Sequence, residues 1–114
     1  MSVLELDEHS FDEVVGASPV PVLLDVTAEW CPPCRAMEPV LAELAVELAD
    51  RLVVASVDVD RHPELVRRYG VMSFPTLLVL VDGVEQARMG GARGRGRLLE
   101  DLRPHLADVG AATR

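Results

Sequence analysis

The chain has 114 residues, of which 49% are hydrophobic, and this length and composition suit one domain around a single buried core. Its formal net charge of −8 at pH 7 argues against nucleic acid or an anionic membrane as the main partner. No stretch approaches the roughly 20 consecutive apolar residues that a membrane-spanning helix needs. Residues 1–8 carry only acidic charges, unlike the basic start of a secretory signal, so we expect a cytoplasmic protein.

The N-terminal segment predicts a short edge strand followed by a short helix. Val3–Leu6 is the candidate strand. Ser10 is a candidate N-cap because Glu13 follows it at the spacing of a capping box, which predicts a helix over Phe11–Val15 that ends at the next glycine.

The next elements are a buried strand and an amphipathic helix. Val22–Val26 is an apolar run in which Asp25 is the one charged residue. Apolar residues then recur at helical spacing, which predicts a helix over residues 34–49. Pro39 lies inside this helix and should kink it, because proline lacks a backbone donor.

The C-terminal half predicts three strands and two helices. Leu52–Val59 reads as a buried strand, and Pro63 opens a short helix that runs to Tyr69. Thr76–Val81 and Val84–Met89 should pair as a hairpin, since Asp-Gly between them favours a tight turn.

The last predicted helix covers Gly96–Leu106, and Pro104 should distort it or end it early. Strands and helices in this order indicate an α/β fold, with a mixed sheet covered by helices on both faces. The arginine- and glycine-rich residues 90–97 lack interleaved aromatic residues, so we interpret them as a loop and helix entry rather than an RNA-binding segment.

Both cysteines of the chain, Cys31 and Cys34, lie at the junction between the buried strand and the following helix. In that context the C-x-x-C pattern predicts a redox site. A structural zinc site is a poor alternative, because it needs four ligands and the histidines show no paired spacing. An inert disulfide is also a poor alternative, since so short a loop adds little stability.

Cys31 is the predicted nucleophile, because unpaired N–H groups at a helix N-terminus stabilise a thiolate. Cys34, one turn into the helix, would then attack Cys31 and release the reduced partner. Burial should raise the pKa of Asp25, which would make it a base for the proton of Cys34. From position alone, an aspartate that merely reaches solvent at the strand end is an equal alternative.

Taken together, the residues resemble the thioredoxin family. The resemblance extends from about Val3 to Leu106 and rests on these segments and residues: Asp25 to Arg35, Pro39, Phe74-Pro75-Thr76, Asp82-Gly83 and Gly91. Three features depart from the family's pattern, namely Pro32 between the cysteines, Val26-Thr27 in place of aromatic residues, and Ser56 where a lysine is often found.

The resemblance implies a thioredoxin fold, with a central mixed five-stranded sheet and four helices. It implies one domain over residues 1–114, with 107–114 as a flexible tail. The implied activity is reduction of protein disulfides, followed by re-reduction by an NADPH-dependent thioredoxin reductase. It further implies a monomer with no bound cofactor or metal, no nucleic-acid partner and no membrane association, and it favours the catalytic role of Asp25.

The resemblance also implies a docking patch for the substrate and a cis peptide before Pro75. The patch is expected to comprise Trp30, Pro32, Pro33, Phe74, Pro75 and Gly91. From the sequence alone, Pro75 could be an ordinary trans proline and Gly91 could merely serve a turn.

Two other functions stay open on the sequence. One is a dedicated extracytoplasmic-type thiol reductase or a disulfide isomerase, which the Pro-Pro pair between the cysteines suggests. The other is a thioredoxin-fold binding subunit in which the cysteine pair is incidental.

Overall fold

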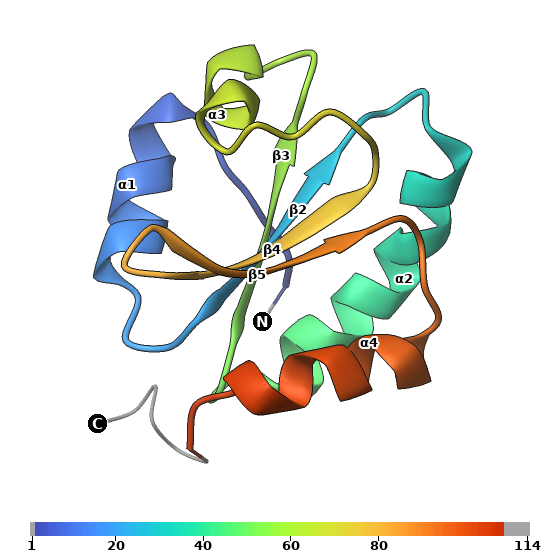
Figure 1. Ribbon diagram of the computed structural model, residues 1–114. Coiled ribbons are helices and arrows are strands. Elements are labelled where there is room, and N and C mark those ends of the chain that lie inside the picture. Colours follow the sequence, from blue (N-terminus) through green and yellow to red (C-terminus); the bar gives the residue numbers. More distant parts are fainter. Residues whose placement is uncertain (1, 109–114) are drawn as a thin grey trace.

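A mixed five-stranded sheet forms the centre of the protein (Figure 1). The computed structural model describes residues 2–108. The strands in chain order are β1 (Leu4–Glu5), β2 (Val22–Thr27), β3 (Val53–Asp58), β4 (Thr76–Val81) and β5 (Val84–Gly90). They are arranged in the order β1-β3-β2-β4-β5. β1, β3 and β2 run parallel, whereas β4 is antiparallel to both β2 and β5.

Two helices cover each face of the sheet, which confirms the expected α/β architecture (Figure 1). The helices are α1 (Glu8–Ala17), α2 (Pro32–Glu47), α3 (Pro63–Arg68) and α4 (Arg95–Leu102). α1 and α3 contribute to the core cluster on one face, and α2 and α4 contribute to the cluster on the other. Pro39 lies inside α2 and does not end the helix. The kink that the sequence predicted at this residue stays a prediction.

The alternation of side chains along β2 distributes its residues between the two faces of the sheet. Val22, Leu24 and Val26 belong to the cluster beneath α1 and α3. Leu23 belongs to the cluster beneath α2 and α4. Asp25, two residues further along, therefore faces the same side as Leu23, toward α2.

The start of α1 differs from the sequence prediction. Asp7 is the N-cap rather than Ser10, and its carboxylate accepts hydrogen bonds from the backbone N–H groups of His9 and Ser10 at 2.9 and 2.8 Å. The Ser10 hydroxyl in turn accepts a hydrogen bond from the Asp7 N–H at 3.0 Å, which closes the capping box. The helix begins three residues earlier than predicted because aspartate caps as well as serine does.

The C-terminal elements agree closely with their predictions. Asp82 and Gly83 both have positive φ, as a tight hairpin turn requires. Helix α4 ends at Leu102, and a short 3₁₀ turn, η1 (Arg103–His105), carries Pro104. Beyond it, the Ala107 carbonyl accepts a hydrogen bond from Arg51 Nε at 2.9 Å. Positions 109–114 of the predicted tail lie outside the described residues.

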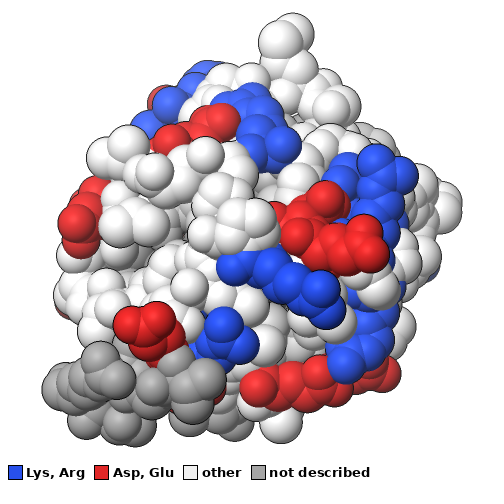
Figure 2. Space-filling model, turned by 60° about the horizontal axis from the view of Figure 1, so that its bottom comes forward, with Lys and Arg blue, Asp and Glu red and all other residues white. Residues whose placement is uncertain are grey.

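The arginines near the C-terminus lie among acidic side chains. Figure 2 shows blue and red side chains next to one another on this face of the molecule. Arg93 Nη1 pairs with Asp101 Oδ2 at 2.7 Å, and Arg95 Nη2 pairs with Glu47 Oε2 at 2.6 Å. Much of the positive charge here is therefore offset. Among residues 2–108, no helix is both long enough and apolar enough to cross a membrane.

Candidate active site

Cys31 and Cys34 form a disulfide at the N-terminus of α2. Cys31 is the N-cap residue, with extended backbone angles, and Cys34 lies in the first turn. This geometry brings the two Cα atoms to 5.3 Å, within the range that a disulfide spans. Cys31 is 4% exposed and Cys34 is 1% exposed, so Cys31 is the more accessible of the two sulfur-bearing residues.

The two prolines at the start of α2 affect which backbone N–H groups face the disulfide. Pro32 and Pro33 occupy the first two helical positions and have no N–H to donate. The first donor of the helix is therefore the Cys34 N–H, which lies 3.3 Å from Cys31 Sγ. One N–H group, that of Cys34, therefore faces Cys31 Sγ. A helix without proline at its first two positions would have additional free N–H groups at this end.

An aromatic pair flanks the disulfide. Trp30 is 62% exposed, and its ring meets the Phe74 ring edge to face, with centroids 5.9 Å apart. Trp30 Nε1 donates a hydrogen bond to Asp60 Oδ2 at 2.8 Å, which holds the indole in place. The carbonyl oxygen of Phe74 lies 3.8 Å from Cys31 Sγ, so this backbone segment touches the redox pair directly.

The peptide bond between Phe74 and Pro75 is cis, as the resemblance implied. The Pro75 carbonyl accepts a hydrogen bond from the Gly91 N–H at 2.9 Å, which joins the loop before β4 to the loop after β5. Gly91 has φ of +86° and is exposed. An added Cβ would meet no atom within 4 Å, so its backbone conformation, rather than crowding within the protein, requires glycine.

Asp25 is a buried carboxylate on the sheet face covered by α2. It is 3% exposed, and its Oδ1 atom has no hydrogen-bond partner among residues 2–108. Burial raises the pKa of Asp25 to about 7, and the negative charge of Glu38 acts in the same direction. The alternative in which Asp25 simply reaches solvent does not fit this degree of burial.

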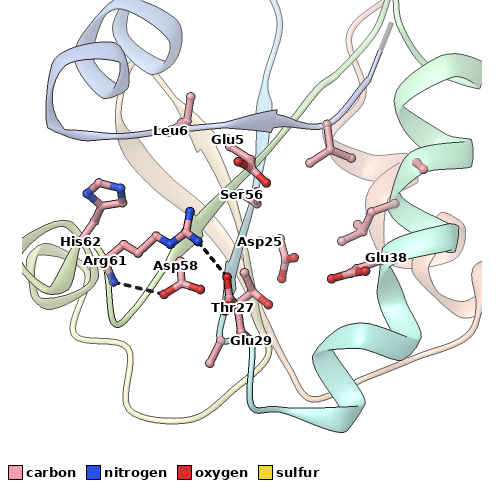
Figure 3. Close-up of a pocket in the computed structure, with 14 residues that line it drawn as sticks. Glu5, Leu6, Asp25, Thr27, Glu29, Glu38, Ser56, Asp58, Arg61 and His62 are labelled. Atoms are coloured by element: carbon pink, nitrogen blue, oxygen red, sulfur yellow. Dashed lines mark hydrogen bonds and ion pairs between the residues drawn. The ribbon is translucent and has the colours of Figure 1, made fainter.

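Asp25 lines a cleft of about 400 Å³ between the sheet and α2. Figure 3 shows the side chains of Asp25 and Glu38 pointing toward each other across this cleft, one from β2 and the other from α2. Thr27 and Ser56 add polar groups to its lining. Ser56 pairs with Asp25 in the β2–β3 register, so an uncharged side chain occupies the strand position beside the carboxylate.

Sequence reasoning assigned no role to Glu38 or Asp60. Glu38 carried a usable signal, because it follows Cys34 by four residues and so lies one helical turn away. Asp60 carried none, since its contact with Trp30 joins two loops that are distant in sequence. Within the described residues, no three histidine, cysteine or carboxylate side chains form a group able to hold a metal ion.

Comparisons with known proteins agree with this geometry. A sequence model of the thioredoxin family matches residues 2–104. The chain is 43% identical over 101 residues to a thioredoxin from Mycobacterium tuberculosis, which covers 89% of this chain and 87% of that protein. It is 41% identical over 103 residues to a thioredoxin from Mycolicibacterium smegmatis, which covers 89% and 92% of the two chains.

A further relative combines two activities in one chain. The bifunctional thioredoxin reductase/thioredoxin of Mycobacterium leprae is 42% identical over 99 residues, which are 87% of this chain but 22% of that protein. The family match and the disulfide between Cys31 and Cys34 agree with each other. The chain therefore belongs to the thioredoxin family of thiol–disulfide oxidoreductases, which act on protein disulfides.

Proposed function

We propose that Cys31 is the nucleophile that reduces a partner's disulfide and that Cys34 resolves the product. The supporting observation is the position of Cys31 Sγ at the N-terminus of α2, where the Cys34 N–H and the helix dipole favour a thiolate. Cys34 is almost fully buried, so a bulky partner protein reaches Cys31 first.

The reaction begins with both cysteines reduced. The Cys31 thiolate attacks one sulfur of the partner's disulfide, so a bond forms between Cys31 and the partner and the partner's own S–S bond breaks. The partner's departing sulfur leaves as a thiolate and takes a proton. The Cys34 thiolate then attacks Cys31 Sγ, so the intramolecular disulfide forms and the mixed disulfide breaks. The partner's second sulfur leaves as a thiolate and takes a proton. Two electrons have passed from the dithiol to the partner.

We assign Asp25 as the base of the resolving step. Cys34 must lose its proton before it can attack, and a carboxylate with a pKa of about 7 can both accept a proton and release it near neutral pH. Asp25 faces α2, whose buried face includes Cys34. Its Oδ1 atom has no hydrogen-bond partner among the described residues and is therefore available for this proton.

The docking patch for the partner comprises exposed apolar residues and one backbone segment beside the disulfide. Trp30, Pro32 and Pro33 are exposed around Cys31. Phe74 and Pro75 contribute the loop whose carbonyl lies against Cys31 Sγ, and Gly91 leaves open space next to that loop. An extended peptide of the partner would bind there through backbone hydrogen bonds and apolar contacts.

The regenerating partner in this proposal is an NADPH-dependent thioredoxin reductase. Its support is the M. leprae relative, whose name joins a reductase to a thioredoxin in one chain. We also propose that the protein acts as a monomer in the cytoplasm. Cell fractionation and sedimentation of the purified protein test these two statements.

Two cysteine variants test the assignment of roles. Cys31→Ser should abolish turnover of insulin disulfides by an NADPH–reductase system, because no thiolate remains to attack. Cys34→Ser should instead accumulate a mixed disulfide with the substrate, detected by mass spectrometry of the intact complex. Trapping through Cys34 in the Cys31→Ser variant would reverse the roles, and full turnover in both variants would refute the proposal.

The redox potential should reflect the two prolines. Pro32→Gly restores one N–H near Cys31 Sγ, so the thiolate should be better stabilised and the disulfide easier to reduce than in the wild type. Equilibration with glutathione measures the difference. A wild-type potential more oxidising than that of Pro32→Gly would contradict the reasoning.

The comparisons do not favour the two alternatives, an extracytoplasmic-type reductase or isomerase and a binding subunit. A binding subunit would retain its partner after both cysteines are replaced by serine. The proposed reductase should lose covalent capture of its substrate completely in that double variant.

A further inference from the structure

Most of the titratable residues that line the cleft containing Asp25 are acidic. The other titratable residues facing it are Glu5 from β1, Glu38 from α2, Asp58 from β3, and Glu29, Arg61 and His62 from the adjoining loops. Both potential cations already contact carboxylates. Arg61 Nη2 pairs with Glu29 Oε1 at 3.0 Å, and His62 Nδ1 lies 2.9 Å from Glu8 Oε2. Burial raises the pKa of Asp25, and the negative charge of Glu38 raises it further.

Glu38 is in a position to influence the buried carboxylate and is itself accessible to solvent. Its side chain is exposed, whereas Asp25 is 3% exposed. It points from α2 toward Asp25 across the cleft (Figure 3), and it lies one helical turn beyond Cys34. A cleft of about 400 Å³ with polar lining has room for several water molecules, each of which occupies about 30 Å³ in the liquid.

We propose that Glu38 is a positioning residue of the redox cycle, whose carboxylate at the mouth of the cleft makes the buried Asp25 a stronger acceptor for the proton of Cys34. Two carboxylates that share one site do not ionise independently, and the buried member holds its proton longer. Ser56, beside Asp25 in the sheet, has no charge that would oppose this effect. The inference deepens the proposed function and rests on it, because Asp25 is there the base for Cys34.

The test is a charge series at Glu38, read directly on the Asp25 carboxyl group. Carbon-13 NMR of the oxidised full chain follows the Asp25 carboxyl carbon through a pH titration, with Asp25→Asn to assign the signal. The pKa of Asp25 should be highest in the wild type, lower in Glu38→Gln and lowest in Glu38→Lys. The difference between the wild type and Glu38→Gln should be about 0.5 pH unit, the size expected for one like charge that is itself exposed to solvent.

Matched control variants separate this local effect from a change in net charge. Glu43 is exposed on the same helix and is not among the residues that line the cleft. Glu43→Gln and Glu43→Lys change the net charge by the same amounts and should leave the pKa of Asp25 within about 0.1 pH unit of the wild type, since distant exposed charges are screened. An equal shift in both series would overturn the inference, as would no shift in either Glu38 variant.

The pH profile of the resolving step provides the functional readout. The rate at which Cys34 releases a mixed disulfide from Cys31 should have an acid limb that moves to lower pH in the same order as the Asp25 pKa. A purely structural role of Glu38 would change the rate without this ordering, and that result would overturn the inference. If Asp25→Asn resolves the mixed disulfide at the wild-type rate, the role of Asp25 in the proposed function is refuted. The NMR series still measures the effect of Glu38 on the pKa of Asp25 in that case.

Discussion

The carboxyl group of Asp25 should make the folded protein progressively less stable as the pH rises through the neutral range. Its pKa is about 7 in the folded protein, against an ordinary value of 3.8. Between these two values the folded protein keeps a proton that the unfolded chain has released, so the free energy of unfolding decreases with increasing pH. Below the lower value both states are protonated and the penalty disappears. Above the upper value the penalty is complete.

The size of the effect follows from the difference between the two pKa values. One pH unit corresponds to about 1.4 kcal/mol, so the full penalty above pH 7 amounts to about 4 kcal/mol. Asp25 is 3% exposed, so solvent screening does not reduce this estimate much. Asp25→Asn removes the ionisation but keeps the shape, and its stability relative to the wild type should therefore rise by about 4 kcal/mol between pH 4 and pH 8.

Urea unfolding of the oxidised protein at several pH values measures this difference. The amide that Asp25→Asn introduces adds a constant offset from packing, so the pH dependence of the difference, not its value at one pH, carries the test. Glu43→Gln, at an exposed carboxylate on α2, is the control and should show a nearly constant difference. A difference between Asp25→Asn and wild type that does not change between pH 4 and pH 8 would refute the burial argument.

Three further substitutions test local structure by urea unfolding at neutral pH. Gly91→Ala should cost about 1–2 kcal/mol, because φ of +86° strains any residue with a side chain; no loss would show that the loop relaxes freely. Asp7→Ala should cost about 1 kcal/mol through loss of the helix cap, and a stable variant would mean that Ser10 suffices. Tyr69→Phe removes the hydrogen bond to the Gly83 carbonyl, 2.8 Å long, and should cost about 1 kcal/mol; an unchanged midpoint would contradict this.

Much of the fold was predictable from local patterns. The apolar run around Asp25 and the Asp82-Gly83 turn each specify their own element through side-chain periodicity or backbone preference. The beginning of α1 was misplaced because Asp7 and Ser10 are both good caps. The choice between them depends on the reciprocal hydrogen bonds that form only when the helix is built.

The sequence by itself determined the redox pair. Cys31 and Cys34 are close in the chain, and the strand-to-helix junction that presents them is encoded by the residues on either side. The prolines between them likewise indicate directly which N–H groups the helix lacks. The chemistry of residues that are close in the chain can be inferred before the fold is known, because the covalent chain limits the distance between them.

Only the tertiary structure decided how the surroundings act on that pair. The Phe74 carbonyl reaches Cys31 Sγ from a loop 43 residues away, and Glu38 faces Asp25 from a different element of the fold. Electrostatic coupling and burial depend on distance and solvent access in three dimensions, which spacing along a chain does not give. The packing of α2 against the sheet therefore sets the pKa of Asp25. The sequence supplied the residue type and its position in a buried strand, but not this packing.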